Sequence, residues 1–176
     1  MKKILKITLA LLIVGFGIFG VSSIYAYLTD IAIASNVVIV GSIDIDINEI
    51  FEPPVKLEPG ISFTKDVSIT NTGISDCYVR IKAVYTDSDM GDYCTLDIDT
   101  ENFIYNEKDN FYYYKNVLKQ GEKSPSLFTT VTLSEAIKAE EIKDFDILIY
   151  AESFQASGFD DYKDAWKYYQ RNDPTK

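Results

Sequence analysis

An alternating run of carboxylates with one glycine lies at 87–92, where the sequence is Asp-Ser-Asp-Met-Gly-Asp. Calcium takes oxygen ligands, and a calcium loop supplies them at alternate positions around a sharp glycine turn. The candidate calcium ligands are therefore Asp87, Asp89 and Asp92. The run lacks the remaining spacing and the closing bidentate glutamate of such a loop. A solvated acidic turn between two strands explains the same residues, and no other cofactor is expected.

Histidine is absent from the 176 residues. This absence excludes Ser-His-Asp and Cys-His catalysis and histidine-based zinc sites, and no glycine-rich phosphate loop is present in the sequence. The formal net charge of −10 and the pI of about 4.4 argue against nucleic acid and anionic membrane surfaces as partners. We therefore expect a protein that is not an enzyme.

Aromatic and sulfur side chains leave two further alternatives open. The run Tyr112-Tyr113-Tyr114 could form a platform on which sugar rings stack, or it could belong to a half-buried strand. The two cysteines, Cys77 and Cys94, could pair in an exported protein. Cys77 alternates with apolar residues, however, and this pattern predicts a small buried side chain on the apolar face of a strand.

The elements that position these residues are predicted to be β-strands, because apolar and polar residues alternate with a period of two. The alternation is clear at 43–48, 61–69 and 77–85 and partial at 127–133, and Lys65 is the one break in the apolar face of the second segment. One apolar face and one solvated face are typical of antiparallel sheets. The runs 37–40 and 145–150 are apolar on both faces, which predicts centrally placed strands.

Turn residues separate these segments, at Pro53-Pro54, Glu58-Pro59-Gly60, Asn71-Thr72-Gly73 and Gln120-Gly121-Glu122. Many short strands at this spacing predict an all-β fold, an antiparallel β-sandwich or jelly roll. One or two short helices are expected, at Ser134–Ile142 and at about Asp160–Gln170. The aromatic side chains at helical spacing in the second helix predict a packing face, and residues 171–176 are expected to be a frayed tail.

The first 26 residues have the three parts of a secretory signal peptide. Lys2 and Lys3 precede an apolar run over 4–21, and Ala26 is a small residue at the exit. We expect cleavage between Ala26 and Tyr27, which leaves one secreted domain at 27–176. The alternative is a retained membrane anchor, since a span needs about 20 apolar residues. Contact with the membrane is then expected only through this uncleaved segment.

The residues around this cleavage site resemble the start of the TasA/camelysin family of Gram-positive secreted proteins. The resemblance lies in Tyr25-Ala26-Tyr27-Leu28-Thr29-Asp30, in Asn36 and in Gly41-Ser42-Ile43-Asp44-Ile45. Leu28 stands where an aromatic residue is commoner in the family. Shorter matches follow in the expected order, at 57–60, 65, 71–73, 78–80, 112–114, 121–122, 127–128 and 150–152. Family members are matured by a SipW-type signal peptidase, so the resemblance implies this peptidase as an export partner.

The resemblance also implies a protein of the cell surface or biofilm matrix that assembles into fibres with copies of itself. Residues 27–40 are the candidate donor strand, because an apolar segment can add to the open sheet edge of a neighbour. The candidate assembly residues are Ile31, Ile33, Val37, Val38, Ile39 and Val40. The first alternative is a monomeric binding module for a glycan or a protein. A camelysin-like metalloprotease is the weakest hypothesis, since the chain has no His-Glu-x-x-His motif.

Overall fold

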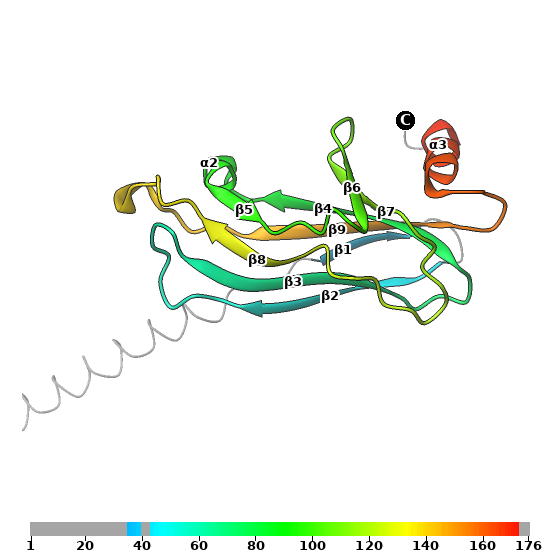
Figure 1. The fold of residues 1–176 in the computed structure, drawn as a ribbon, viewed down its shortest axis with the longest axis horizontal. Coiled ribbons are helices and arrows are strands. Elements are labelled where there is room, and N and C mark those ends of the chain that lie inside the picture. Colours follow the sequence, from blue (N-terminus) through cyan, green and yellow to red (C-terminus); the bar gives the residue numbers. More distant parts are fainter. Residues whose placement is uncertain (1–34, 40–42, 173–176) are drawn as a thin grey trace, which may run out of the picture. The chain divides into compact units, whose positions relative to one another are not determined.

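Two β-sheets packed face to face form the part of the chain that the structure describes (Figure 1). The computed structural model describes residues 35–39 and 43–172. The first sheet has the strand order β1-β9-β4-β7-β6, and the second has the order β2-β3-β8-β5. The strands are β1 Ser35–Ile39, β2 Ile45–Glu52, β3 Ser62–Asn71, β4 Cys77–Tyr85, β5 Cys94–Leu96, β6 Phe103–Asn106, β7 Phe111–Tyr114, β8 Phe128–Leu133 and β9 Ile147–Gln155. This architecture confirms the mostly β fold that the alternation predicts.

One strand pair differs from the others among the described strands. β1 lies at the edge of the five-stranded sheet and pairs in parallel with β9, with Val37 opposite Ala151. The other neighbouring strands are antiparallel, and β4 pairs with β9 along its whole length. β9 is therefore flanked on both sides, as its apolar residues at 147–150 predict. The central position expected for the run at 37–40 is wrong, because β1 is an edge strand of the sheet.

The main core lies between the two sheets, because alternate residues of each strand point to the same face. In β4 the side chains of Cys77, Val79 and Ile81 are all 0% exposed, as the alternation predicts. The other buried side chains of this core are Ile43, Ile45, Val67, Ile69, Phe103, Leu118, Leu127, Phe128, Val131, Ile147, Ile149 and Ala151.

The opposite face of β4 was expected to be solvated, and this expectation is wrong. Tyr78 and Arg80 on this face are only 3% and 6% exposed. The helix α3, Tyr162–Asn172, packs its Trp166 against Tyr78 and the neighbouring aromatic side chains of the sheet. Figure 1 shows α3 above one end of the five-stranded sheet. Both faces of this sheet are thus covered over part of their area.

Of the two helices predicted from the sequence, the structure contains one and lacks the other among the described residues. α3 confirms the helix expected at 160–170, and it includes the first two residues of the expected tail. The helix expected at Ser134–Ile142 is instead a single 3-10 turn, Ala139–Glu141 (η1). The chain before this turn buries Ile137 to 2% exposure against Met90 and Leu133, and this packing replaces a continuous helix.

The break in the apolar face of β3 is explained by a charged partner on β2. Lys65 Nζ lies 3.1 Å from Glu49 Oε2, and the two side chains are 8% and 6% exposed. The ammonium group also lies 5.2 Å from the centre of the Phe51 ring. A buried charge is tolerated when it is paired in this way, so a charged side chain occupies an otherwise apolar position.

Candidate functional site

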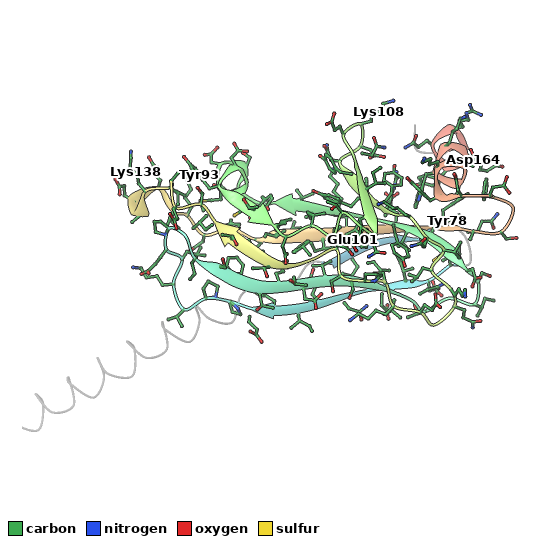
Figure 2. The ribbon with its side chains drawn as sticks, viewed as in Figure 1. Tyr78, Tyr93, Glu101, Lys108, Lys138 and Asp164 are labelled. Carbon is green, nitrogen blue, oxygen red and sulfur yellow. The ribbon has the colours of Figure 1, made fainter. Side chains whose placement is uncertain are left out.

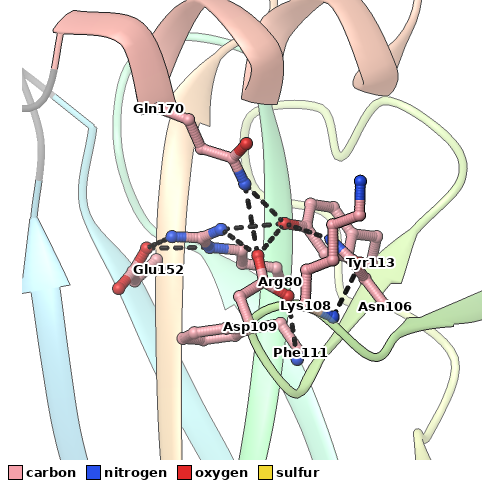
Figure 3. A network of polar contacts seen from close by, with 8 residues as sticks. All are labelled: Arg80, Asn106, Lys108, Asp109, Phe111, Tyr113, Glu152 and Gln170. Atoms are coloured by element: carbon pink, nitrogen blue, oxygen red, sulfur yellow. Dashed lines mark hydrogen bonds and ion pairs between the residues drawn. The ribbon is translucent and has the colours of Figure 1, made fainter.

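The largest polar network of the described residues is centred on Arg80, in the middle of β4 (Figure 3). The register places Arg80 opposite Tyr113 of β7 and opposite Glu152 of β9. Residues directly opposite each other in a sheet point to the same face, with Cβ atoms about 4.5–5.5 Å apart. The strand alignment alone therefore brings a guanidinium, a phenol and a carboxylate into one row beneath α3.

The guanidinium of Arg80 is held by two carboxylates. Its Nε donates to Glu152 Oε2 at 2.8 Å, and its Nη2 donates to the same oxygen. Its Nη1 donates to Asp109 Oδ2 at 3.0 Å and to the Tyr113 hydroxyl at 2.8 Å. Hydrogen bonds between charged groups are the strongest kind in proteins. The cation is thus satisfied on both sides although it is buried.

Asp109 reaches the network from the turn between β6 and β7. Its Oδ1 accepts from the backbone N–H of Phe111 at 3.3 Å, and Asn110 has the left-handed φ of 60° that this turn requires. Its Oδ2 accepts from Tyr113 and, at 3.3 Å, from Gln170 of α3. One carboxylate oxygen therefore joins the hairpin, the sheet and the helix.

Aromatic rings enclose the same guanidinium. Its central carbon lies 4.3 Å from the ring centre of Phe111 and 4.4 Å from that of Trp166. Tyr169 and Tyr113 follow at 5.4 Å and 5.6 Å. Cations within about 6 Å of a ring centre are attracted to the face of the ring, most strongly where water is excluded. Trp166 Nε1 is buried and has no hydrogen-bond partner among the described residues.

The environment keeps both titratable donors protonated at neutral pH. Burial lowers the pKa of Arg80, but its interactions with Glu152 and Tyr113 raise this pKa by more than burial lowers it. The net shift of the pKa is therefore upward. Burial raises the pKa of Tyr113, and its hydrogen bond to Asp109 raises it again. The site therefore holds a permanent cation and a neutral phenol. Its chemistry is suited to fixing α3 on the sheet rather than to proton transfer.

The expected calcium ligands lie on a one-turn helix, α2, Ser88–Asp92, and not in an extended loop. Asp87 is its N-cap, and its Oδ1 accepts from the Met90 N–H at 3.1 Å. Lys143 Nζ lies 3.3 Å from Asp87 Oδ2 and 3.1 Å from Asp89 Oδ2, whereas Asp92 is exposed at the end of the turn. The hydrogen bond to Met90 lowers the pKa of Asp87, and Lys143 lowers it too.

The assembly residues are described only in part. Val37, Val38 and Ile39 belong to β1, whose backbone pairs with β9. Ile31, Ile33 and Val40, like the cleavage site at Ala26 and Tyr27, lie outside the described residues. The structure thus places residues 35–39 of the candidate donor strand within its own sheet.

The tyrosine run belongs to a strand, β7, and its three side chains have different neighbours. Tyr113 joins the Arg80 network, and Tyr114 packs on Phe103 with ring centres 5.3 Å apart. Tyr112 packs on Tyr105, at 4.8 Å, and Tyr105 is 46% exposed. The half-buried strand is confirmed.

The two cysteines do not pair. Both are free thiols, and Cys77 is fully buried, as predicted for a small apolar side chain. Burial raises the pKa of Cys77 to about 12, and it raises the pKa of Cys94 to about 11. Neither thiol is a reactive thiolate at neutral pH.

No family model matches the chain, and no curated protein matches it. Within residues 35–39 and 43–172, no helix is long and apolar enough to cross a membrane. The same residues contain no group of three or more cysteine, aspartate or glutamate side chains placed to hold a metal ion.

Arg80, Asp109, Glu152 and Gln170 were not foreseen from the sequence. Arg80 lies on the strand face that the alternation predicts to be solvated, and the contacts within this group join residues 29 to 72 positions apart. One indication was available: an aromatic helix face at 162–169 needs an apolar surface to cover, and Tyr78 beside Arg80 offers one.

Proposed function

We propose that this protein is a secreted structural protein of the cell surface or biofilm matrix that assembles into fibres by donation of its N-terminal strand. The observation that supports this proposal is the position of β1. It is an edge strand, it follows the segment expected to begin the mature chain, and it pairs in parallel with a single neighbour, β9, among the described strands. An edge strand with one partner is the element most easily exchanged.

Withdrawal of β1 would leave the backbone N–H and C=O groups along one side of β9 unpaired. An unpaired edge accepts an added strand, and β1 of a second copy has the sequence that fits this register. Donation from copy to copy then builds an open chain. We further propose a jelly roll for the sandwich, because the first strand neighbours the last and β3 neighbours β8.

A disulfide experiment tests strand donation. Val37 and Ala151 are opposite each other, and adjacent strands bring Cα atoms within the roughly 4.4–6.8 Å that a disulfide needs. The double variant V37C/A151C, oxidised as a monomer, should be locked and should assemble only after reduction. Mixed single variants V37C and A151C, oxidised after assembly, should give covalent links between chains, whereas the parent protein should give none.

The outcomes separate the alternatives. A locked double variant that assembles like the parent would overturn strand donation. A parent protein that remains monomeric at every concentration, by negative-stain imaging and light scattering, would overturn the fibre proposal and favour the binding module.

Export is part of the same proposal. Cleavage after Ala26 by a SipW-type peptidase requires a small residue at that position, so A26R should leave the protein in the membrane fraction. Mass spectrometry of the secreted parent should give Tyr27 as its first residue. A secreted form that begins before Ser22 would contradict the assignment.

A second candidate function, a monomeric module that binds a glycan, is favoured by one observation. Tyr105 packs against Tyr112 at the β6–β7 hairpin and is 46% exposed, so part of an aromatic side chain is accessible to a sugar. Titration with cell-wall glycan fragments tests it: the parent should bind and Y105A should not. Equal binding by both would exclude this hairpin as the site.

A further inference from the structure

Two charged surfaces lie at opposite ends of the β4–β9 ladder. The ladder runs from the pair Cys77–Gln155 to the pair Tyr85–Ile147. A strand rises about 3.3 Å per residue, so its ends are roughly 26 Å apart. α3 follows the Gln155 end of the ladder, whereas α2 and η1 adjoin the Tyr85–Ile147 end. Figure 2 shows this separation, with Asp164 of α3 at one end and Lys138 and Tyr93 at the other.

Three exposed cations follow one side of α3, and Asp164 next to them is the acidic side chain of this helix. Lys163, Lys167 and Arg171 are spaced by four residues, which places them along one side of a helix, and all three are exposed. None of the three forms an ion pair with another described residue. We call these residues the basic stripe. Exposed Asp160 and Asp161 lie just before the helix, so the cations are confined to this one row.

The opposite end is acidic, and part of its charge has no partner. Asp92 and Glu135 flank the end of the β5–β8 ladder, where Cys94 is opposite Leu133. Asp92 is the last residue of α2, Glu135 follows the end of β8 by two residues, and both side chains are exposed. Lys143 pairs with Asp87 and Asp89 and Lys138 pairs with Glu141, but no described cation pairs with Asp92, Glu135 or Glu140. We call these three residues the acidic end.

We propose that the basic stripe of one copy docks on the acidic end of the next. This inference rests on the self-assembly proposed above, and its contact uses residues other than those of the donated strand. The occupant is a second copy because each copy offers both complementary surfaces. Surfaces that differ and lie at opposite ends give a heterologous contact, which repeats into an open filament unless the rotation closes a ring. Such a contact also fixes the direction in which successive copies join.

A charge-reversal pair tests the contact. The variant K167E/R171E has two acidic surfaces, and the variant D92K/E135K has two basic ones. Each alone should lose assembly, with a critical concentration raised at least tenfold, because like charges then meet. An equal mixture should restore assembly, since each variant complements the other at both ends. The control K119E/K123E changes net charge as K167E/R171E does, at exposed residues of the β7–β8 loop, and should assemble like the parent.

The results are decisive in each direction. Variants that assemble alone like the parent, or a mixture that does not assemble, would overturn the end-to-end contact while leaving fibre formation intact. A parent that never assembles would overturn both proposals. Tight binding of dextran sulfate to the parent, lost in K167E/R171E while assembly persists, would assign the stripe to an anionic polymer and overturn the contact.

Discussion

The buried charge of Arg80 makes the first residue-level prediction. Removal of one partner from a buried ion pair leaves an uncompensated charge and is destabilising by about 3–5 kcal/mol. Arg80→Met retains much of the volume but leaves Glu152 and Asp109 without their cation. We expect its free energy of unfolding, measured in urea, to fall by at least about 3 kcal/mol. Lys82→Met, on the same face of β4, is the matched control. A loss below about 1 kcal/mol for Arg80→Met would contradict the account.

The buried thiol of Cys77 predicts a loss of stability at high pH. Its pKa of about 12 in the folded protein lies well above the value of about 8.5 expected after unfolding. The folded state then holds a proton that the unfolded state releases. Stability is therefore complete below the unfolded pKa and falls as pH rises from there towards 12. Cys77→Ala should lower stability at pH 7 but flatten this decline between pH 9 and 11, in urea titrations at each pH. If the free energy of unfolding of the variant declines with pH as steeply as that of the parent, other groups, such as the buried tyrosines, control the decline.

The acidic turn at 87–92 gives a test of calcium. Lys143 already lies between Asp87 and Asp89, and the N-cap bond to Met90 uses one oxygen of Asp87. A calcium ion would have to displace this ammonium group, so millimolar calcium should leave the melting temperature nearly unchanged. Binding to the folded state would raise it by linkage. A large rise that Asp89→Asn abolishes would establish the site.

At the scale of the elements, α3 is held by burial of one large side chain. Trp166 is 2% exposed and packs against Arg80, Tyr113 and Phe154. Truncation of a buried tryptophan is typically destabilising by about 3–5 kcal/mol. Trp166→Ala should therefore lower the free energy of unfolding by that order and expose Tyr78 to quenching by acrylamide. Tyr168→Ala, at a position 54% exposed, is the control and should have a much smaller effect.

The strands and α3 could be predicted because the spacing of apolar residues that indicates each element lies within that element's own sequence. Alternation in β4 fixed the buried positions of Cys77, Val79 and Ile81, and the spacing of aromatic residues fixed the packing face of α3. What covers the other face of β4 depends on where the chain returns more than 80 residues later, and no local pattern records this. The Arg80 network was missed for that reason. The helix expected at 134–142 failed because burial of Ile137 outweighed local propensity.

At the scale of the whole molecule, ionic strength acts on two kinds of charge interaction. The net charge of −10 repels copies over long distances, and about 0.1 M salt screens this repulsion beyond roughly 10 Å. Ion pairs in direct contact, such as those proposed between the basic stripe of one copy and the acidic end of the next, are screened mainly near 1 M salt, where the Debye length is about 3 Å. Association should therefore rise from low salt to about 0.15 M and fall again near 1 M. Light scattering across this range of salt concentration measures association. The variant K167E/R171E should not show the decrease in association near 1 M.

Acidification tests the same balance through protonation. Carboxylates of model peptides have pKa values of about 3.9–4.3, so a fall in pH from 8 to 5 can only add protons to carboxylates and reduce the negative charge. Protonation removes negative charge, so repulsion decreases as pH falls from 8 to 5 and association should increase in that direction. The parent should then scatter more light at pH 5 than at pH 8, whereas a chain that lacks residues 27–40 should remain monomeric at both. If deletion instead unfolds the domain, by circular dichroism, β1 is an obligatory strand of its own sheet and donation is excluded. Identical monomeric behaviour of both chains throughout would favour a binding module, because the charge on the surface would then serve solubility alone.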